Sequence, residues 1–134
     1  MIDFLIIGGG IAGTSAAARL APLGKVTLLE GESALGYHAS GRSAALFEQN
    51  YGSPSTIALN RASRAYHDTA GVLSPRGLLL VGSPDNTEAF EADKTGMEMQ
   101  EITLAEARAM VPILHPDTVT RAAYHAEALD IDTD

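Results

Sequence analysis

The residues best suited to chemistry in this sequence form a glycine-rich turn near the N-terminus. Residues 8–13 read G-x-G-x-x-G and follow a short apolar run at residues 4–7. In such a turn Gly8 allows the sharp bend, Gly10 lets a diphosphate approach the backbone, and Gly13 permits close helix packing. The unpaired N–H groups and the positive dipole end of the following helix would then face the phosphates. The pattern predicts a dinucleotide-binding turn.

The elements around this turn must place it at the edge of a sheet. We expect a strand at residues 4–7, a helix at residues 11–20 and a second strand at residues 26–29, with Glu30 at its tip. An acidic residue about 20 positions past the turn accepts hydrogen bonds from ribose hydroxyls and repels a 2′-phosphate. A purely structural glycine turn is the alternative. Because strand, helix, second strand and acid fall in register, we favour nucleotide binding.

Composition limits the remaining possibilities. The chain has 134 residues, one domain's worth, with 46% apolar residues, a net charge of -8 and no cysteine. The negative charge argues against nucleic acid or an anionic membrane as partner. The absence of thiols excludes disulfides and cysteine-ligated metals from this chain. The N-terminus lacks the basic region of a signal peptide, and no integral membrane segment is expected, so we predict a cytoplasmic protein.

The rest of the chain alternates helices and strands. The spacing predicts strands at residues 78–82 and 119–125 and helices at residues 54–69 and 84–97. Thr103 and Glu106 predict a capping box that opens a short helix ending at Met110.

Residues 37–45 are open to two interpretations. A helix beginning near residues 41–43 would offer backbone N–H groups to an anion, with Arg42 as a second positive element. The alternative is a Gly/Ser loop with a surface arginine. His67, His115 and His125 are expected to be surface or turn residues, whereas His38 stands in this more suggestive segment. No metal site is expected.

Taken together, these residues resemble the N-terminal part of the FAD-dependent oxidoreductases of the D-amino-acid oxidase/glycine oxidase superfamily. Within it the resemblance is closest to the bacterial D-arginine dehydrogenases. It covers essentially the whole chain and rests on these segments: IIGGGIAG, VTLLE, GYHASGRSAA, ASRAY, LSPRG and ALDIDTD.

The resemblance implies roles for particular residues. FAD is the implied cofactor, and a small amine or amino acid is the implied partner. Tyr51 resembles the substrate-contacting tyrosine of the family and would position the substrate. The implied FAD-binding residues are Gly8, Gly10, Ala12 and Gly13 at the diphosphate, Glu30 and Gly31 at the adenosine ribose, and Ala39, Ser40, Gly41, Arg42, Ser43, Ala44, Ala45 and Leu46 around the phosphate and flavin.

Two positions depart from the pattern of the D-arginine dehydrogenases. Leu46 stands where those enzymes have an active-site histidine, and Leu78 where they have a substrate-binding glutamate. A carboxylate is what a guanidinium or ammonium side chain needs as a partner. These departures predict a smaller or more apolar amine substrate than D-arginine.

The resulting expectation is an α/β fold, with a Rossmann-like FAD-binding βαβ unit and part of an α+β substrate domain. We predict an FAD-binding portion at residues 1–74 and a substrate-binding portion at residues 75–134, both incomplete because family members are longer. The intact enzyme would oxidise a C–N bond by hydride transfer to flavin. The alternatives are an NAD-dependent Rossmann dehydrogenase and a non-catalytic nucleotide-binding subunit or remnant. A missing C-terminal half or a partner chain would complete the fold.

Overall fold

The chain forms two compact units: residues 1–44 together with Thr133, and residues 45–132. The computed structural model describes residues 1–133, so Asp134, which ends the predicted substrate-binding portion, lies outside the described residues. This contact-based division falls earlier in the chain than the functional boundary expected after residue 74, which stays a prediction.

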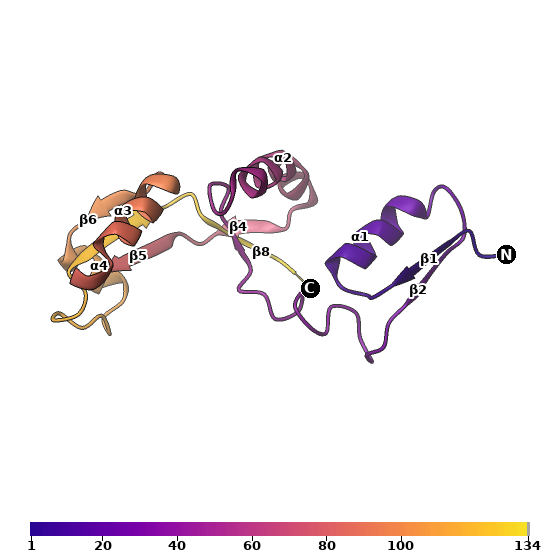
Figure 1. Cartoon of the computed structure of the whole chain (residues 1–134), viewed down its shortest axis with the longest axis horizontal. Helices are drawn as coiled ribbons and strands as arrows, with labels where there is room; N and C mark the ends of the chain where they lie inside the picture. Colours follow the sequence, from indigo (N-terminus) through magenta and orange to yellow (C-terminus); the bar gives the residue numbers. More distant parts are fainter. Residues whose placement is uncertain (134) are drawn as a thin grey trace. The chain divides into compact units, whose positions relative to one another are not determined.

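The first unit is the predicted strand–helix–strand (Figure 1). Strands β1 (Phe4–Ile7) and β2 (Val26–Leu29) are parallel, in the register Phe4↔Val26 to Ile7↔Leu29, and helix α1 (Ile11–Leu20) connects them. Parallel strands need such a crossover because the first strand ends at the opposite end of the pair from where the second strand begins. The Rossmann-like βαβ unit expected from the sequence is confirmed.

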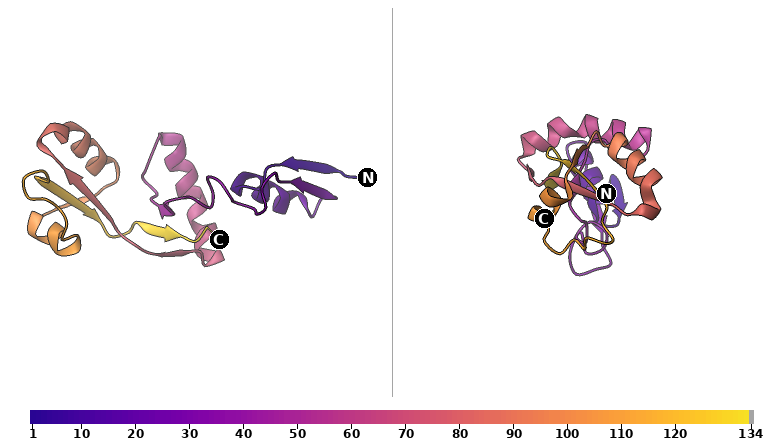
Figure 2. Two further views of the ribbon diagram at one scale, coloured as in Figure 1. Left: turned by 90° about the horizontal axis from the view of Figure 1, so that it is seen from below. Right: turned by 90° about the vertical axis from the view of Figure 1, so that its left-hand side faces the viewer.

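Helix α1 covers one face of this strand pair (Figure 2). The other face carries apolar side chains that remain exposed, among them Leu5 at 57% and Ile7 at 82%. Buried parallel strands are normally covered on both faces. The unit therefore presents an uncovered apolar face.

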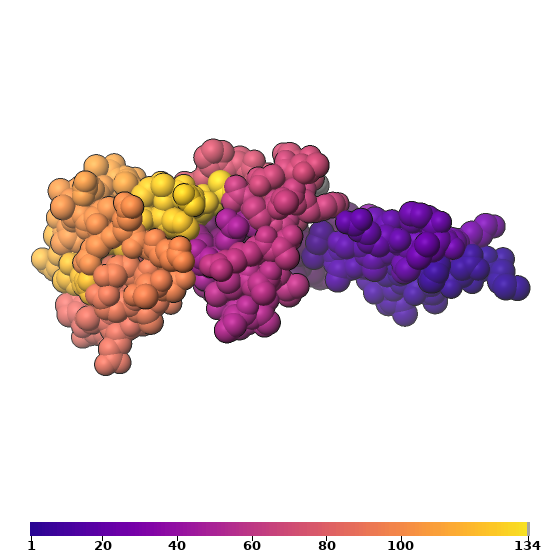
Figure 3. All heavy atoms as spheres, turned by 90° about the horizontal axis from the view of Figure 1, so that it is seen from above, coloured from indigo at the N-terminus to yellow at the C-terminus, as the bar shows by residue number. Residues whose placement is uncertain are grey.

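The second unit contains two three-stranded antiparallel sheets. The order is β3-β8-β4 in one sheet and β5-β7-β6 in the other. The C-terminal strand β8 pairs with β3 from the start of the unit, and these segments touch in the space-filling view (Figure 3). The bounds are β3 Leu46–Phe47, β4 Leu73–Pro75, β5 Leu78–Gly82, β6 Gln100–Ile102, β7 Arg121–His125 and β8 Leu129–Ile131.

The helices of this unit begin and end at the expected signals. Helix α2 (Pro54–Ala70) is capped by Ser53 and closed by Gly71 in the left-handed region. A 3-10 turn (Pro84–Asn86) leads into α3 (Thr87–Gly96), and the predicted capping box opens α4 (Leu104–Met110). In residues 1–133 no helix combines the length and apolarity needed to cross a bilayer.

A small core lies between α3 and the β5-β7-β6 sheet. Phe90 is 2% exposed and packs with Met97, Met99 and Ala123. A Cβ added at Gly82 in β5 would lie 2.8 Å from the Phe90 ring, so the glycine makes room for the aromatic side chain. Helix α3 contacts β5 and α4 contacts β7. These contacts fix β7, which leads into the pocket described below.

Charged side chains cover this core. The Arg121 guanidinium lies 4.6 Å from the Phe90 ring centre and forms ion pairs with Glu91 and Glu101, while the Lys94 ammonium contacts the same two carboxylates. Hydrogen bonds from Lys94 and Arg121 lower the pKa of Glu91, with the larger contribution from Lys94. Hydrogen bonds from the same two residues lower the pKa of Glu101, with the larger contribution from Arg121. The network joins α3, β6 and β7.

The main differences from the sequence expectations concern short segments. Residues 41–42 form a turn and residues 43–45 have no regular secondary structure, so the helix considered there is absent from the described structure. The strands β3, β4, β6 and β8 were not predicted. Strands this short carry little periodicity, and distant partners define them.

Candidate functional site

Three glycines of the turn are explained by the protein itself. Gly8 has φ +100°, a left-handed conformation that L side chains rarely adopt. A Cβ on Gly13 would collide with the Gly8 carbonyl oxygen, and a Cβ on Gly9 would collide with Leu35 and lie 2.8 Å from Glu30 Oε2. Gly13 thus lets α1 pack closely against the end of β1, as predicted.

Gly10 has no comparable internal reason to be glycine. Its φ of -75° and ψ of -178° are open to any residue, and an added Cβ would meet only Ser40 Oγ, at 3.3 Å. A side chain there would instead fill the space at the amino end of α1. A ligand that approaches the backbone at this point accounts for the glycine.

The first turn of α1 keeps donors available for such a ligand. Ser40 Oγ accepts the Ile11 N–H at 2.9 Å. Among residues 1–133, the N–H groups of Gly10, Ala12 and Gly13 have no protein acceptor. Free N–H groups at the positive end of a helix dipole fit a diphosphate. The residues present therefore fit the phosphates of a dinucleotide.

Glu30 lies directly against this turn. Its Oε2 accepts the Gly9 N–H at 2.6 Å, and its Oε1 accepts the N–H groups of Gly31 at 2.7 Å and Glu32 at 3.0 Å. The hydrogen bonds from Glu32, Gly9 and Gly31, together with nearby His38, lower the pKa of Glu30. The carboxylate is held ionised beside the glycine-rich turn, and its contact with a ribose stays a prediction.

The predicted phosphate and flavin segment forms a compact loop in the first unit. The Gly41 N–H donates to the Gly36 carbonyl at 2.6 Å, and the Arg42 guanidinium lies 5.5 Å from the Tyr37 ring centre. Ser40 is the loop residue that reaches α1. This places the side chain of Ser40 beside the helix terminus. The predicted site residues in this loop are Ala39, Ser40, Gly41, Arg42, Ser43 and Ala44.

Three further predicted site residues belong to the second unit. Ala45 has φ +56°, and its carbonyl accepts the Ile131 N–H at 2.8 Å. Leu46 begins β3 opposite Asp130, and the Tyr51 ring is exposed. A left-handed alanine costs about 1–2 kcal/mol, so β8 holds this backbone in an unfavourable conformation. The roles of these residues toward FAD and substrate stay predictions.

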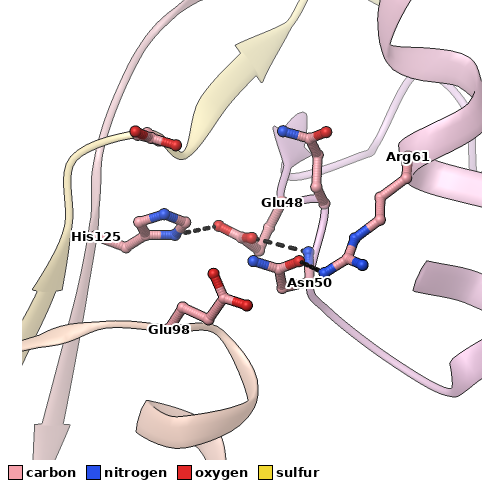
Figure 4. Close-up of a pocket in the computed structure, with 7 residues that line it drawn as sticks. Glu48, Asn50, Arg61, Glu98 and His125 are labelled. Carbon is pink, nitrogen blue, oxygen red and sulfur yellow. Dashed lines mark hydrogen bonds and ion pairs between the residues drawn. The ribbon is translucent and has the colours of Figure 1, made fainter. Parts of the chain in front are cut away.

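The second unit also contains a polar pocket of about 400 Å³ (Figure 4). It opens where the chain leaves β3, beside α2 and the end of β7. A second hollow of about 250 Å³ shares Glu98, His125 and Glu127 with it. The pocket is lined by Glu48, Gln49, Asn50, Arg61, Glu98, His125 and Glu127.

A buried carboxylate–imidazole pair forms one wall of this pocket. Glu48 Oε2 lies 2.7 Å from His125 Nδ1, and the two side chains are only 2% and 15% exposed. The second oxygen, Oε1, accepts the Asn50 N–H at 2.9 Å. A charged group is tolerated at such depth only when it is paired and hydrogen-bonded. Both oxygens of Glu48 meet that condition.

Helix α2 holds the opposite wall. The Asn60 side-chain amide donates to the carbonyl oxygens of Glu48 at 3.1 Å and Tyr51 at 3.4 Å. Arg61 Nη2 donates to Asn50 Oδ1 at 2.6 Å. Residues 48–51 are thereby fixed between α2 and β7.

Sequence reasoning missed this pocket. His125 was expected to be a surface or turn residue, which is wrong because it is largely buried against Glu48. One signal was present: Glu48 directly follows the apolar residues of β3. A carboxylate in that position needs a buried partner, but the sequence alone does not name it.

Comparison with known proteins relates nearly the whole chain to one group. Residues 3–134 match the family model described as DAO, FAD dependent oxidoreductase. A curated relative, L-2-hydroxyglutarate dehydrogenase of Escherichia coli K12, is 36% identical over an alignment of 96 residues, and the match covers 63% of this chain and 23% of that protein.

Solved structures share the fold over almost the full chain. L-proline dehydrogenase from P. horikoshii gives a TM-score of 0.70 at 22% identity and is matched over 98% of this chain and 38% of its own. L-α-glycerophosphate oxidase from Mycoplasma pneumoniae, solved with FAD bound, gives 0.74 at 20% identity, over 98% and 39%. The chain thus spans well under half of the proteins it matches.

These findings correct one expectation. The predicted likeness was closest to D-arginine dehydrogenases, whereas the curated relative is named for L-2-hydroxyglutarate. Specificity for D-amino acids is therefore unsupported.

Proposed function

The chain belongs to the DAO family of FAD-dependent oxidoreductases, and from that premise we propose that the intact protein oxidises the C–N bond of a small amine or amino acid. The proposal concerns the whole enzyme, of which this chain supplies the diphosphate-binding turn and part of the substrate side. The family match favours FAD over the NAD alternative. A non-catalytic remnant stays an alternative because the chain spans only 23% of its curated relative.

The observation that carries the cofactor assignment is the amino end of α1. Gly10 is glycine without a conformational need, and three N–H groups beside it lack protein acceptors within residues 1–133. Glu30, ionised and fixed by three backbone donors, stands where it would accept an adenosine ribose hydroxyl. The proposed diphosphate and ribose contacts are made by this chain's own backbone and one carboxylate.

Bound flavin would supply the redox chemistry by accepting a hydride equivalent from the substrate carbon. The chain's own contribution is to bind and orient. The first turn of α1 would hold the phosphates, the loop at residues 37–44 would border them, and Tyr51 would position the substrate. An amine gives up a hydride more readily when its nitrogen lone pair is free, so a nearby proton acceptor would assist.

A second candidate is oxidation of the C–O bond of a 2-hydroxy acid. The 36% identity to a protein named for L-2-hydroxyglutarate favours it. Both reactions use the same cofactor and differ in the charge that the substrate pocket must accept.

Flavin binding and substrate choice can be tested separately. The purified chain is titrated with FAD and followed by flavin fluorescence. Gly10→Val should abolish binding because its side chain would occupy the diphosphate space. Gly96→Val, where an added Cβ meets nothing within 4 Å, should leave binding unchanged. Equal flavin binding by wild type and Gly10→Val would refute the proposed diphosphate position.

Substrate choice is tested on the intact protein with flavin bound. Anaerobic bleaching of the flavin absorbance by L-2-hydroxyglutarate but by no amine or amino acid would decide for the second candidate. Bleaching by an amino acid or amine would support the first. The absence of bleaching with both, despite bound flavin, would favour the non-catalytic alternative.

A further inference from the structure

We propose that the pocket of Figure 4 binds an ammonium group, and that His125 Nε2 is the atom that accepts one of its hydrogens. This inference deepens the proposed function, on which the identification of that ammonium as part of the substrate rests. The pocket lies entirely within residues 45–132, so its binding properties can be measured without flavin.

The hydrogen-bonding role of His125 follows from Glu48. The Nδ1 atom lies 2.7 Å from Glu48 Oε2, and because a carboxylate is an acceptor we assign the ring proton to Nδ1. In a neutral imidazole the other nitrogen, Nε2, then presents a lone pair. Among the described residues Nε2 has no hydrogen-bond partner, and His125 borders both hollows. The ligand group that fits there is a donor.

The charges around His125 select a cationic donor. The carboxylates of Glu98 and Glu127 border the pocket in addition to Glu48. One guanidinium opposes them, that of Arg61, and its Nη2 is already bound to Asn50 at 2.6 Å. An anion entering the pocket would meet more negative than positive charge, whereas an ammonium would be attracted.

The pocket thus distinguishes the two candidate substrates by charge. An amine can place its N–H groups at His125 Nε2 and toward these carboxylates. A dicarboxylate such as 2-hydroxyglutarate has no group that both donates to Nε2 and relieves the negative field. The inferred ligand class is a small primary amine. An amino acid also fits if an additional amino group offsets the charge of its carboxylate.

The test uses the complete 134-residue chain and three probes of one shape. Butylammonium, 1-butanol and butyrate are titrated at pH 7.5 while ¹⁵N resonances of the His125 ring and the backbone amides around the pocket are recorded. We expect a bare Nε2 in the free chain. Butylammonium should shift it together with the Asn50 and Glu98 amides, and the other two probes should bind about tenfold or more weakly, as expected for loss of a charge-assisted hydrogen bond.

Three variants separate binding from folding. Glu48→Gln keeps an acceptor for Nδ1 but removes the buried charge, and should weaken butylammonium binding about tenfold. Glu98→Gly should also weaken binding, yet it should not lower the unfolding midpoint, because Glu98 has φ +55°, where glycine is favoured. Glu88→Gln removes an exposed carboxylate on α3 outside the pocket and should leave butylammonium binding unchanged.

Several results would overturn the inference. Butyrate or butanol binding as tightly as butylammonium would remove the charge argument. A proton found on Nε2, with Nδ1 bare, would remove the acceptor. Unchanged binding in both folded pocket variants would place the ligand elsewhere. Failure of FAD to bind the chain, by contrast, would affect the proposed cofactor site alone and leave these titrations valid.

Discussion

Replacement of Gly13 by alanine tests the geometry on which the cofactor site depends. Alanine stabilises a helix interior by about 1 kcal/mol relative to glycine. The new Cβ, however, would collide with the carbonyl oxygen of Gly8. That carbonyl is backbone, and Gly8 is itself tied to β2 through the bond from its N–H to the Leu29 oxygen at 2.8 Å. The clash can be relieved only by moving α1 or the strand pair.

Overpacking of this kind costs about 1–3 kcal/mol and more when backbone must move. Because backbone must move here, we place the cost in the upper part of that range, at about 2–3 kcal/mol, and expect Gly13→Ala to destabilise the first unit by about 1–2 kcal/mol after the helix gain is subtracted. Native-state hydrogen exchange measures this directly. A loss of about 1.4 kcal/mol would raise the exchange rates of the protected amides in β1, β2 and α1 about tenfold.

Gly31→Ala is the matched control, because nothing lies within 4 Å of its added Cβ. It should leave exchange unchanged or slow it slightly through the lower entropy of the unfolded chain. If Gly13→Ala instead slows amide exchange by the amount that the helix propensity of alanine alone predicts, the close approach of α1 to the turn is refuted.

Three further predictions concern the second unit. Phe90→Ala should lower its free energy of unfolding by about 3–5 kcal/mol, measured by urea denaturation, since this side chain is the largest one fully buried; a cost below about 1 kcal/mol would contradict the described core. Thr103→Ala should cost about 1 kcal/mol through loss of the α4 cap, and Ser should restore it. Because the pKa values of Glu91 and Glu101 are lowered from 4.5 in the folded chain, their ion pairs stabilise it above that pH and are lost as the pH falls through the lowered values. The urea midpoint should therefore drop on acidification below about pH 4.5, and it should drop less in a variant with both glutamates replaced by Gln.

Local signals allowed much of the first unit and most helix ends to be predicted. Residues 8–13 specify the turn because glycine conformations and helix termini depend on neighbours in sequence. The caps at Ser53, Gly71 and Thr103 likewise act within one helical turn. These features appeared where the sequence placed them.

The resemblance to a family gave the cofactor, and the family match confirms it. It did not give the substrate. Leu46 and Leu78 were interpreted as the loss of polar contacts, and a smaller or more apolar amine was expected on that basis. In the fold Leu78 pairs with His125 across β5 and β7, and His125 contacts Glu48. The fold thus connects the Leu78 position, through His125, to the carboxylate of Glu48, although residue 78 itself is not an acid.

Tertiary structure alone decided the pocket. Glu48 and His125 are separated by 77 positions, and they meet because β3 pairs with β8 while β7, just before β8, crosses the second sheet. No local sequence pattern predicts this contact, because the residues around Glu48 and around His125 are compatible with many tertiary arrangements. What the sequence determined by itself was the short-range geometry of the glycine-rich turn at residues 8–13. Which distant charges share one cavity was set by strand pairing, because burial of a carboxylate is favourable only where the fold supplies its partner.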